Sequence, residues 1–262
     1  MSTKQASTFN IAIDFQRDGY YLAHNVFAES ALEQLESDFD RIVEQLEDSG
    51  ESINARWDSA NTDKLDGGES KILHTHNVHR YSAYWLSALR NENFLDQTQH
   101  ILGPDIILHH SKLFQKPPGE GAPFPIHQDW WYFPTHKDTM IAAVIFLGDA
   151  DDECGGFRVY PGSHKLGRAN NSSGLGTSEF LQSYPLDEAT PISASRGDVL
   201  FFSYFILHGS MPNHSDRVRK TVLVQMYSGQ DYLLPNKEVN HVDEQLVLRG
   251  WNYHMTRELA SQ

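Results

Sequence analysis

The chain has 262 residues, with 35 acidic against 21 basic side chains and a formal net charge of -14 at pH 7. This charge argues against nucleic acid or an anionic membrane surface as the main partner. The length suits one domain with a large core, because barrels and sandwiches of this size commonly form a single unit. A single cysteine excludes an intramolecular disulfide and suits a reducing cytoplasm.

No stretch approaches the roughly 18 consecutive apolar residues of a membrane span. The first ten residues are polar and lack the apolar centre of a signal peptide. We therefore expect a cytoplasmic protein with no membrane partner.

The N-terminal part, residues 1–105, is predicted to be mainly helical after a short strand at residues 20–27. Ser30 followed by Glu33 has the form of a capping box, which would start a helix. An apolar stripe with helical spacing follows at Leu32, Leu35, Phe39, Ile42, Val43 and Leu46. It predicts a helix of about four turns that packs against a sheet. Residues 84–90 and 93–102 predict two further short helices.

From residue 106 the pattern becomes that of β-strands, predicted at residues 106–116, 126–133, 139–147, 157–160, 199–205 and 218–227. Residues 139–147 form a continuous apolar run, and the strands at 199–205 and 218–227 are apolar on alternate and intervening positions, which indicates burial on both faces. Helices followed by short strands predict a mainly β fold with α additions. The expected architecture is a barrel or jelly roll with the N-terminal helices packed outside.

Three further segments carry weaker signals. Residues 47–70 and 165–190 lack an apolar period and predict long loops; the second is a candidate lid. The tail after residue 229 has mixed signals, and residues 242–248 resemble a helix.

The stretch from residue 125 to 133 sets His127 and Asp129 two positions apart inside an apolar, aromatic run. In a strand this spacing places both side chains on one face. With a second histidine they would form a two-histidine, one-carboxylate triad that leaves metal positions open. His208 is the candidate, because it lies at the end of a buried strand and opens a Gly/Pro/Asn turn.

Basic residues lie at two other places that the predicted strands bring toward this site. Arg217 and Arg219 share strand parity, and an arginine at either position could bind a carboxylate bidentately. His110, Lys112 and Phe114 share parity with Lys116, so we expect all four to point into the same barrel.

Taken in this order, the residues resemble the phytanoyl-CoA dioxygenase family of Fe(II)/2-oxoglutarate oxygenases. The resemblance spans roughly residues 14–227. It rests on His127-x-Asp129, His208-Gly209-Ser210 and Arg219, together with Lys116-Pro117-Pro118-Gly119, the run from Phe157 to His164, and Asn213-x-Ser215-Asp216-Arg217. It implies one oxygenase domain over residues 1–262, with a double-stranded β-helix (cupin-like jelly roll) at 106–228 and a C-terminal extension at 229–262.

The resemblance also implies a role for each of these side chains. His127, Asp129 and His208 would hold Fe(II). The far carboxylate of the cosubstrate 2-oxoglutarate would lie on Arg219, helped by Ser210, with Lys116 nearby. The family spacing selects Arg219 rather than Arg217.

The family reaction uses O2, converts 2-oxoglutarate to succinate and CO2, and hydroxylates or otherwise oxidises a C–H bond of a small organic molecule. Halogenating members of this structural class carry a small residue in place of the carboxylate. Asp129 therefore implies oxygenation.

Two rival functions would use the same ligands. One is a non-catalytic, cupin-like binding protein, and the other is a zinc-dependent hydrolase or isomerase. Other side chains have open roles: His74, His76 and His79 either bind a metal or line a pocket, and Trp131 and Phe133 either close the substrate site or pack in the core. The sequence identifies neither the substrate nor the oligomeric state.

Overall fold

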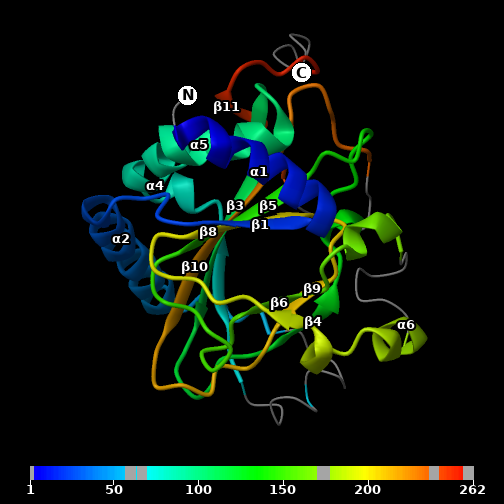
Figure 1. Ribbon diagram of the computed structural model, residues 1–262. Helices are drawn as coiled ribbons and strands as arrows, with labels where there is room; N and C mark the ends of the chain where they lie inside the picture. The colour runs from blue at the N-terminus through cyan, green and yellow to red at the C-terminus, as the bar shows by residue number, and fades with distance from the viewer. Residues whose placement is uncertain (1–2, 57–62, 64–69, 170–177, 236–241, 256–262) are drawn as a thin grey trace.

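The structure, a computed structural model, describes residues 3–56, 63, 70–169, 178–235 and 242–255. Within these residues the chain forms two antiparallel β-sheets that face each other, with most helices on the outer side of the larger sheet (Figure 1). No helix in the described part of the chain is long and apolar enough to cross a membrane.

The large sheet contains seven strands. Along the sheet their order is β1 (Tyr20–Ala23), β8 (Val199–Ser203), β5 (Ile141–Phe146), β10 (Arg219–Ser228) and β3 (Ile106–Lys116), and both β2 (Leu73–His76) and β11 (Leu246–Arg249) pair with the far edge of β3. The predicted strand at 106–116 therefore has the correct bounds.

The small sheet contains four strands, in the order β4 (Phe124–His127), β9 (His208–Ser210), β6 (Phe157–Val159) and β7 (Thr190–Pro191). Its residues Phe157 and Val159 pack against Ala142, Val144 and Phe202 of the large sheet. The two sheets form the predicted cupin-like jelly roll.

The helices α1 (Thr3–Asp18), α2 (Glu29–Asp48), α4 (Ala83–Ala88) and α5 (Glu92–Leu102) belong to the N-terminal part. All six residues of the predicted α2 stripe are buried. They share a core with Val222 and Val224 of β10, whose neighbours Leu223 and Gln225 face the interior between the sheets. The strands are thus covered on both faces, which explains why they are apolar at successive positions.

Short helices make up much of the remainder: η1 (Val78–Arg80), η2 (Asp129–Trp131), η3 (Ser163–Leu166), α6 (Ser178–Ser183) and η4 (Leu186–Glu188). The segment 165–190 is therefore not simply a loop, since it contains α6 and η4, while residues 170–177 lie outside the described residues. Half of the predicted loop at 47–70, residues 57–62 and 64–69, also lies outside them.

Three sequence predictions are wrong in detail. The capping box at Ser30 is not formed: α2 begins at Glu29, and its N-cap Ala28 makes no side-chain hydrogen bond. The acidic Glu29 in the first turn still favours a helix start there. The predicted strand 126–133 ends at His127, because the amides of Asp129 and Trp130 both donate to the Tyr204 carbonyl and turn the chain.

The third error is the helix expected at residues 242–248. Gln245 has a left-handed φ of 51°, which a helix does not allow, and Leu246–Arg249 forms strand β11 instead. The edge of β3 has backbone N–H and C=O groups that need partners, and pairing with β11 gives both strands their backbone hydrogen bonds.

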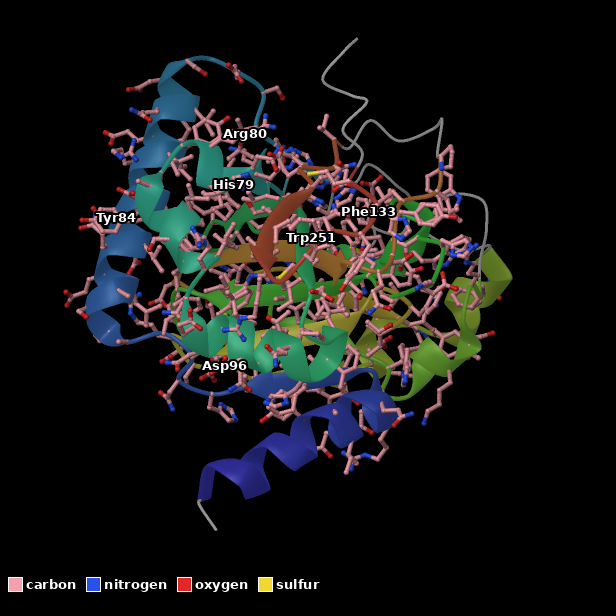
Figure 2. All side chains as sticks on the ribbon, turned by 90° about the horizontal axis from the view of Figure 1, so that it is seen from above. His79, Arg80, Tyr84, Asp96, Phe133 and Trp251 are labelled. Atoms are coloured by element: carbon pink, nitrogen blue, oxygen red, sulfur yellow. The ribbon has the colours of Figure 1, made fainter. Side chains whose placement is uncertain are left out.

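His79 and Arg80 belong to η1 (Figure 2) and contact Glu244, which precedes β11. The Nδ1 of His79 lies 2.9 Å from the hydroxyl of Ser111, and its Nε2 lies 3.5 Å from a carboxylate oxygen of Glu244. Arg80 donates to the same carboxylate. These contacts indicate a structural role for His79.

Candidate metal centre

His127, Asp129 and His208 converge between the two sheets. His127 is the last residue of β4 and is the register partner of His208, the first residue of β9. The Nε2 atoms of the two histidines lie 3.4 Å and 3.7 Å from Oδ1 of Asp129. One ligand atom from each residue lies within 4.8 Å of the others, a spacing suited to one metal ion.

The close approach of β4 and β9 requires the glycine that follows His208. A Cβ on Gly209 would lie 2.7 Å from the carbonyl oxygen of Phe124, closer than such contacts allow. Glycine at this position therefore permits the pairing that brings His127 beside His208.

Backbone carbonyls set the tautomer of both histidines. The Nδ1 of His127 lies 2.8 Å from the carbonyl oxygen of Pro125, and that of His208 lies 3.1 Å from the carbonyl oxygen of Ile206. Because a carbonyl can only accept, Nδ1 carries the hydrogen and Nε2 presents its lone pair toward Asp129. This is the tautomer that metal binding through Nε2 requires.

The protonation states also suit a metal. Burial opposes the charge of Asp129, but the neighbouring His208, His127 and Gln225 outweigh it and lower the pKa of Asp129 to about 2. Burial, reinforced by His127, lowers the pKa of His208 to about 4. A carboxylate and a neutral imidazole are the forms that bind a divalent metal.

Gln225 of β10 completes this arrangement, and sequence reasoning missed it. Its amide donates to Oδ2 of Asp129 at 2.7 Å, which leaves Oδ1 for a metal. The spacing along the strand could have identified it: Gln225 lies six residues after Arg219 on β10, and residues separated by an even number share a face.

Arg219 and Lys116 lie at the other end of the cavity, where they are register partners on β10 and β3. Arg219 is 3% exposed; its guanidinium donates to the Gly155 carbonyl, and its Nε has no hydrogen-bond partner among the described residues. Burial lowers its pKa to about 10, so it stays charged at neutral pH. A buried cation with an unused donor fits a ligand carboxylate.

Lys116 supports this end without lining the cavity. Its fully buried ammonium donates to the Ser210 hydroxyl at 2.7 Å and to the Met211 carbonyl at 2.6 Å. Burial lowers its pKa well below the ordinary value, and the charge of Arg219 lowers it further. Because the Ser210 oxygen accepts from Lys116, its own hydrogen can be donated to a ligand.

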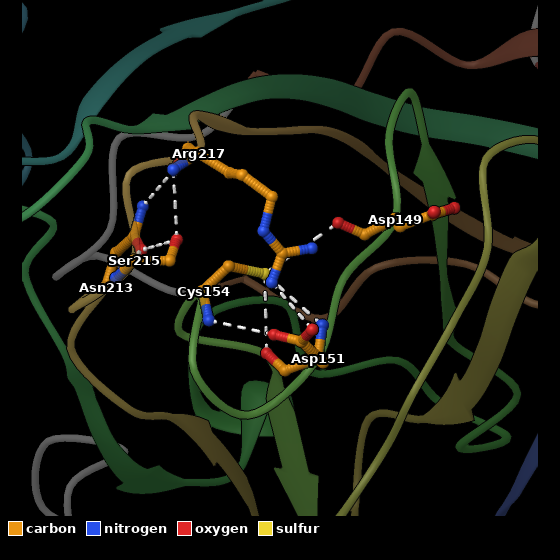
Figure 3. A network of polar contacts seen from close by, with 6 residues as sticks. All are labelled: Asp149, Asp151, Cys154, Asn213, Ser215 and Arg217. Carbon is orange, nitrogen blue, oxygen red and sulfur yellow. Dashed lines mark hydrogen bonds and ion pairs between the residues drawn. The ribbon is translucent and has the colours of Figure 1, made fainter.

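Arg217 does not line the cavity, and its guanidinium points toward Asp151 (Figure 3). Its side chain is 41% exposed and pairs with Asp151 at 2.6 Å. Asp151 also accepts from the backbone N–H of Cys154, within the turn that presents the Gly155 carbonyl to Arg219. Asn213 closes the segment by donating to the Arg217 carbonyl. Arg217 therefore holds a surface turn, and Arg219 faces the interior.

A cavity of about 210 Å³ connects the two ends. It is lined by all three triad residues, by Arg219 and Ser210, and by inward-facing residues of neighbouring strands, including His74, His110, Lys112, Phe114, Leu223 and Gln225. Tyr132 and Phe133 also line it, whereas Trp131 does not. In the described part of the chain, no other group of three metal-ligating side chains meets the same distance limit.

Taken together, the fold and the donor set define a class of protein. Two histidines and one carboxylate on a jelly roll, with metal positions left open toward a cavity, are typical of non-haem Fe(II) oxygenases. The buried arginine at the far end is suited to a dicarboxylate cosubstrate.

Comparisons with known proteins identify the family. The model of the family "Phytanoyl-CoA dioxygenase (PhyH)" matches residues 15–221, and the chain belongs to this family. It is 32% identical to a probable alpha-ketoglutarate-dependent hypophosphite dioxygenase of Stutzerimonas stutzeri, over 72% of this chain and 68% of that protein. It is 24% identical to the ectoine dioxygenase of Streptomyces anulatus, over 80% of this chain and 74% of that protein.

A solved structure shares the fold. The epimerase SnoN in complex with Fe3+, alpha ketoglutarate and nogalamycin RO has a TM-score of 0.72 and 17% identity, over 95% of this chain and 98% of that one. The predicted class is confirmed: the protein is an Fe(II)- and 2-oxoglutarate-dependent oxygenase. The rival functions, a non-catalytic binding protein and a zinc hydrolase, are not supported.

Proposed function

We propose that His127, Asp129 and His208 hold the iron, and that Arg219 and Ser210 bind the far carboxylate of 2-oxoglutarate. The observation that carries this proposal is the convergence of the three ligand atoms within 4.8 Å, at the wall of the same cavity that Arg219 lines. Lys116 has an indirect role, because its hydrogen bond orients the Ser210 hydroxyl.

Bound Fe(II) would supply O2 activation coupled to the conversion of 2-oxoglutarate to succinate and CO2, and thereby the oxidation of an unreactive bond. The chain itself contributes position and exclusion of water. Gln225 keeps one oxygen of Asp129 occupied, and Arg219 fixes the cosubstrate. The apolar walls formed by Phe114, Phe133 and Leu223 limit the access of water.

The reaction we propose is hydroxylation of a small molecule. Asp129 supports oxygenation, because its carboxylate occupies the position that halogenating enzymes leave to halide. Relatives named for hypophosphite and for ectoine support a compact substrate. We also propose that residues 1–262 form one oxygenase domain, since β11 of the C-terminal extension adds to the same sheet as β3. A cytoplasmic location and the absence of a nucleic-acid partner stay predictions.

The test removes one ligand. Asp129→Ala should abolish both Fe(II)-dependent succinate formation and the visible absorption that appears when 2-oxoglutarate chelates Fe(II) without oxygen. Asp216→Ala is the matched control, because Asp216 is exposed and lies outside the cavity lining. If the Asp129 variant consumed 2-oxoglutarate at the wild-type rate, the ligand assignment would be wrong.

A further inference from the structure

A third cation, Lys112, faces the same cavity, and the proposed function does not use it. Lys112 lies on the inward face of β3 together with His110 and Phe114. Its ammonium forms no hydrogen bond or ion pair with the residues that the structure describes, and it lies 5.9 Å from the centroid of the Phe114 ring. A cation in this position is available to a ligand.

The position of Lys112 separates it from the cosubstrate anchor. In the register of β3 with β10, Lys112 pairs with Leu223, whereas Lys116 pairs with Arg219. Four residues along a strand correspond to about 13 Å. Arg219 and Ser210 lie on β10 and β9, but Lys112 adjoins β2, which carries His74 at the edge of the sheet. Lys112 therefore lies four residues along β3 from the Arg219–Lys116 pair, between β10 and β2.

With Fe(II) and 2-oxoglutarate bound, the other charges in the cavity would cancel and the positive charge of Lys112 would remain. Fe(II) and the Arg219 guanidinium together carry three positive charges, and Asp129 and 2-oxoglutarate carry three negative ones. Lys116 does not line the cavity, and its ammonium already donates to the Ser210 hydroxyl and the Met211 carbonyl. Burial lowers the pKa of Lys112 to about 8 against the influence of Asp129, so its ammonium is mainly protonated at pH 7. One negative charge from the substrate would make the cavity neutral.

His74 supplies a second polar group beside Lys112. Its strand pairs with β3 so that His74 faces Phe114, and its ring lines the cavity. Its Nδ1 is buried and has no hydrogen-bond partner in the part of the chain that the structure describes. Burial and the charge of Lys112 lower its pKa to about 4, so the ring is neutral and can donate one hydrogen bond to an oxyanion.

We propose that Lys112 and His74 bind the anionic head group of the substrate, a compact molecule that carries one negative charge on a carboxylate or phosphorus oxyanion. This inference rests on the proposed function, because it assigns Arg219 to 2-oxoglutarate. The cavity of about 210 Å³ is smaller than the roughly 300–1,000 Å³ of most ligand pockets, which favours a compact substrate.

The experiment measures binding to the full-length protein loaded with Fe(II) and 2-oxoglutarate in the absence of oxygen. Calorimetric titrations with hypophosphite and with propionate separate the two sources of the charge, and propionamide is the neutral counterpart of propionate. We expect wild-type protein to bind at least one of the anions and not to bind propionamide. Lys112→Met should weaken anion binding roughly 10- to 100-fold.

Two further variants keep the test specific. Lys112→Arg retains the charge and should recover much of the anion affinity. Lys137→Met removes the same charge from an exposed position and should behave as wild type. The Kd of 2-oxoglutarate in Lys112→Met should stay within about twofold of the wild-type value, because Arg219 is intact.

Three outcomes would overturn the inference: binding of propionamide as tight as that of propionate, no binding of either anion to the wild type, or a loss of 2-oxoglutarate affinity in Lys112→Met that exceeds the loss for the anion. The last would assign Lys112 to the cosubstrate. Failure of the proposed function is distinguishable, because wild-type protein with Fe(II) would then fail to bind 2-oxoglutarate before any anion is added.

Discussion

Arg219→Ala is expected to raise the KM for 2-oxoglutarate by about 10- to 150-fold. Arg219 is 3% exposed, so water does not screen its bond with a bound carboxylate. A hydrogen bond to a charged group contributes about 1.5–3 kcal/mol, and about 1.4 kcal/mol corresponds to a factor of ten in affinity. The guanidinium contacts a carboxylate remote from the reacting centre, so kcat should fall less than kcat/KM.

The assay is succinate formation at varied 2-oxoglutarate concentrations, with anaerobic binding of 2-oxoglutarate as a second readout. Arg217→Ala is the control. Its ion pair is largely exposed, contributes only about 0–1 kcal/mol to stability, and lies outside the cavity, so KM should stay within about twofold. Arg219→Lys should lie between the two, because lysine keeps the charge but loses the planar fork. The reasoning is refuted by an unchanged KM in Arg219→Ala, or by an equal rise in Arg217→Ala.

Three other predictions follow from buried contacts. Gln225→Leu should weaken Fe(II) binding about 10- to 100-fold in a chelator competition, because it removes the donor that orients Asp129, and an unchanged affinity would contradict this role. Phe39→Ala should lower the free energy of unfolding by about 3–5 kcal/mol in urea denaturation, since Phe39 is fully buried between α2 and the large sheet, and a loss below about 1 kcal/mol would argue against that packing. Burial raises the pKa of Asp243 to about 6, so the folded state loses stability as pH rises from about 4 to 6, where this carboxyl is charged in the unfolded chain. Asp243→Asn should therefore raise the Tm above pH 6, with a gain of at most about 3 kcal/mol in the free energy of unfolding, and have little effect at pH 4. An equal effect at both pH values would point to a cause other than ionisation.

Periodicity made much of the fold predictable. The α2 stripe is spaced for one helix face, and burial of all six residues follows from that spacing. Strand β3 has the predicted bounds because alternation and the Pro117-Pro118-Gly119 turn are local signals. The close spacing of His127 and Asp129 in the sequence also keeps them together: Nε2 of His127 lies 3.4 Å from Oδ1 of Asp129, even though the strand ends between them.

Local spacing could not show that His208 and Arg219 belong to the same site as His127 and Asp129, and the resemblance to the family predicted it. His208 lies 79 positions beyond Asp129, and only the pairing of β4 with β9 brings them together. Arg217 and Arg219 have the same parity, so alternation alone cannot separate them. Arg219 enters the strand and is buried, whereas Arg217 precedes it and pairs with Asp151 at the surface.

The sequence by itself determined the apolar faces of helices and strands, the types of metal ligand and the parity of the cavity wall, because each depends on spacing within one segment. Tertiary structure decided the rest. The Tyr204 carbonyl ends β4 at His127, and the free edge of β3 makes a strand of residues 246–249. The same structure joins Gln225 to Asp129 and leaves Lys112 in the cavity without a direct ion pair among the described residues. Each of these outcomes depends on a group that is distant in sequence and close only after the sheets have formed.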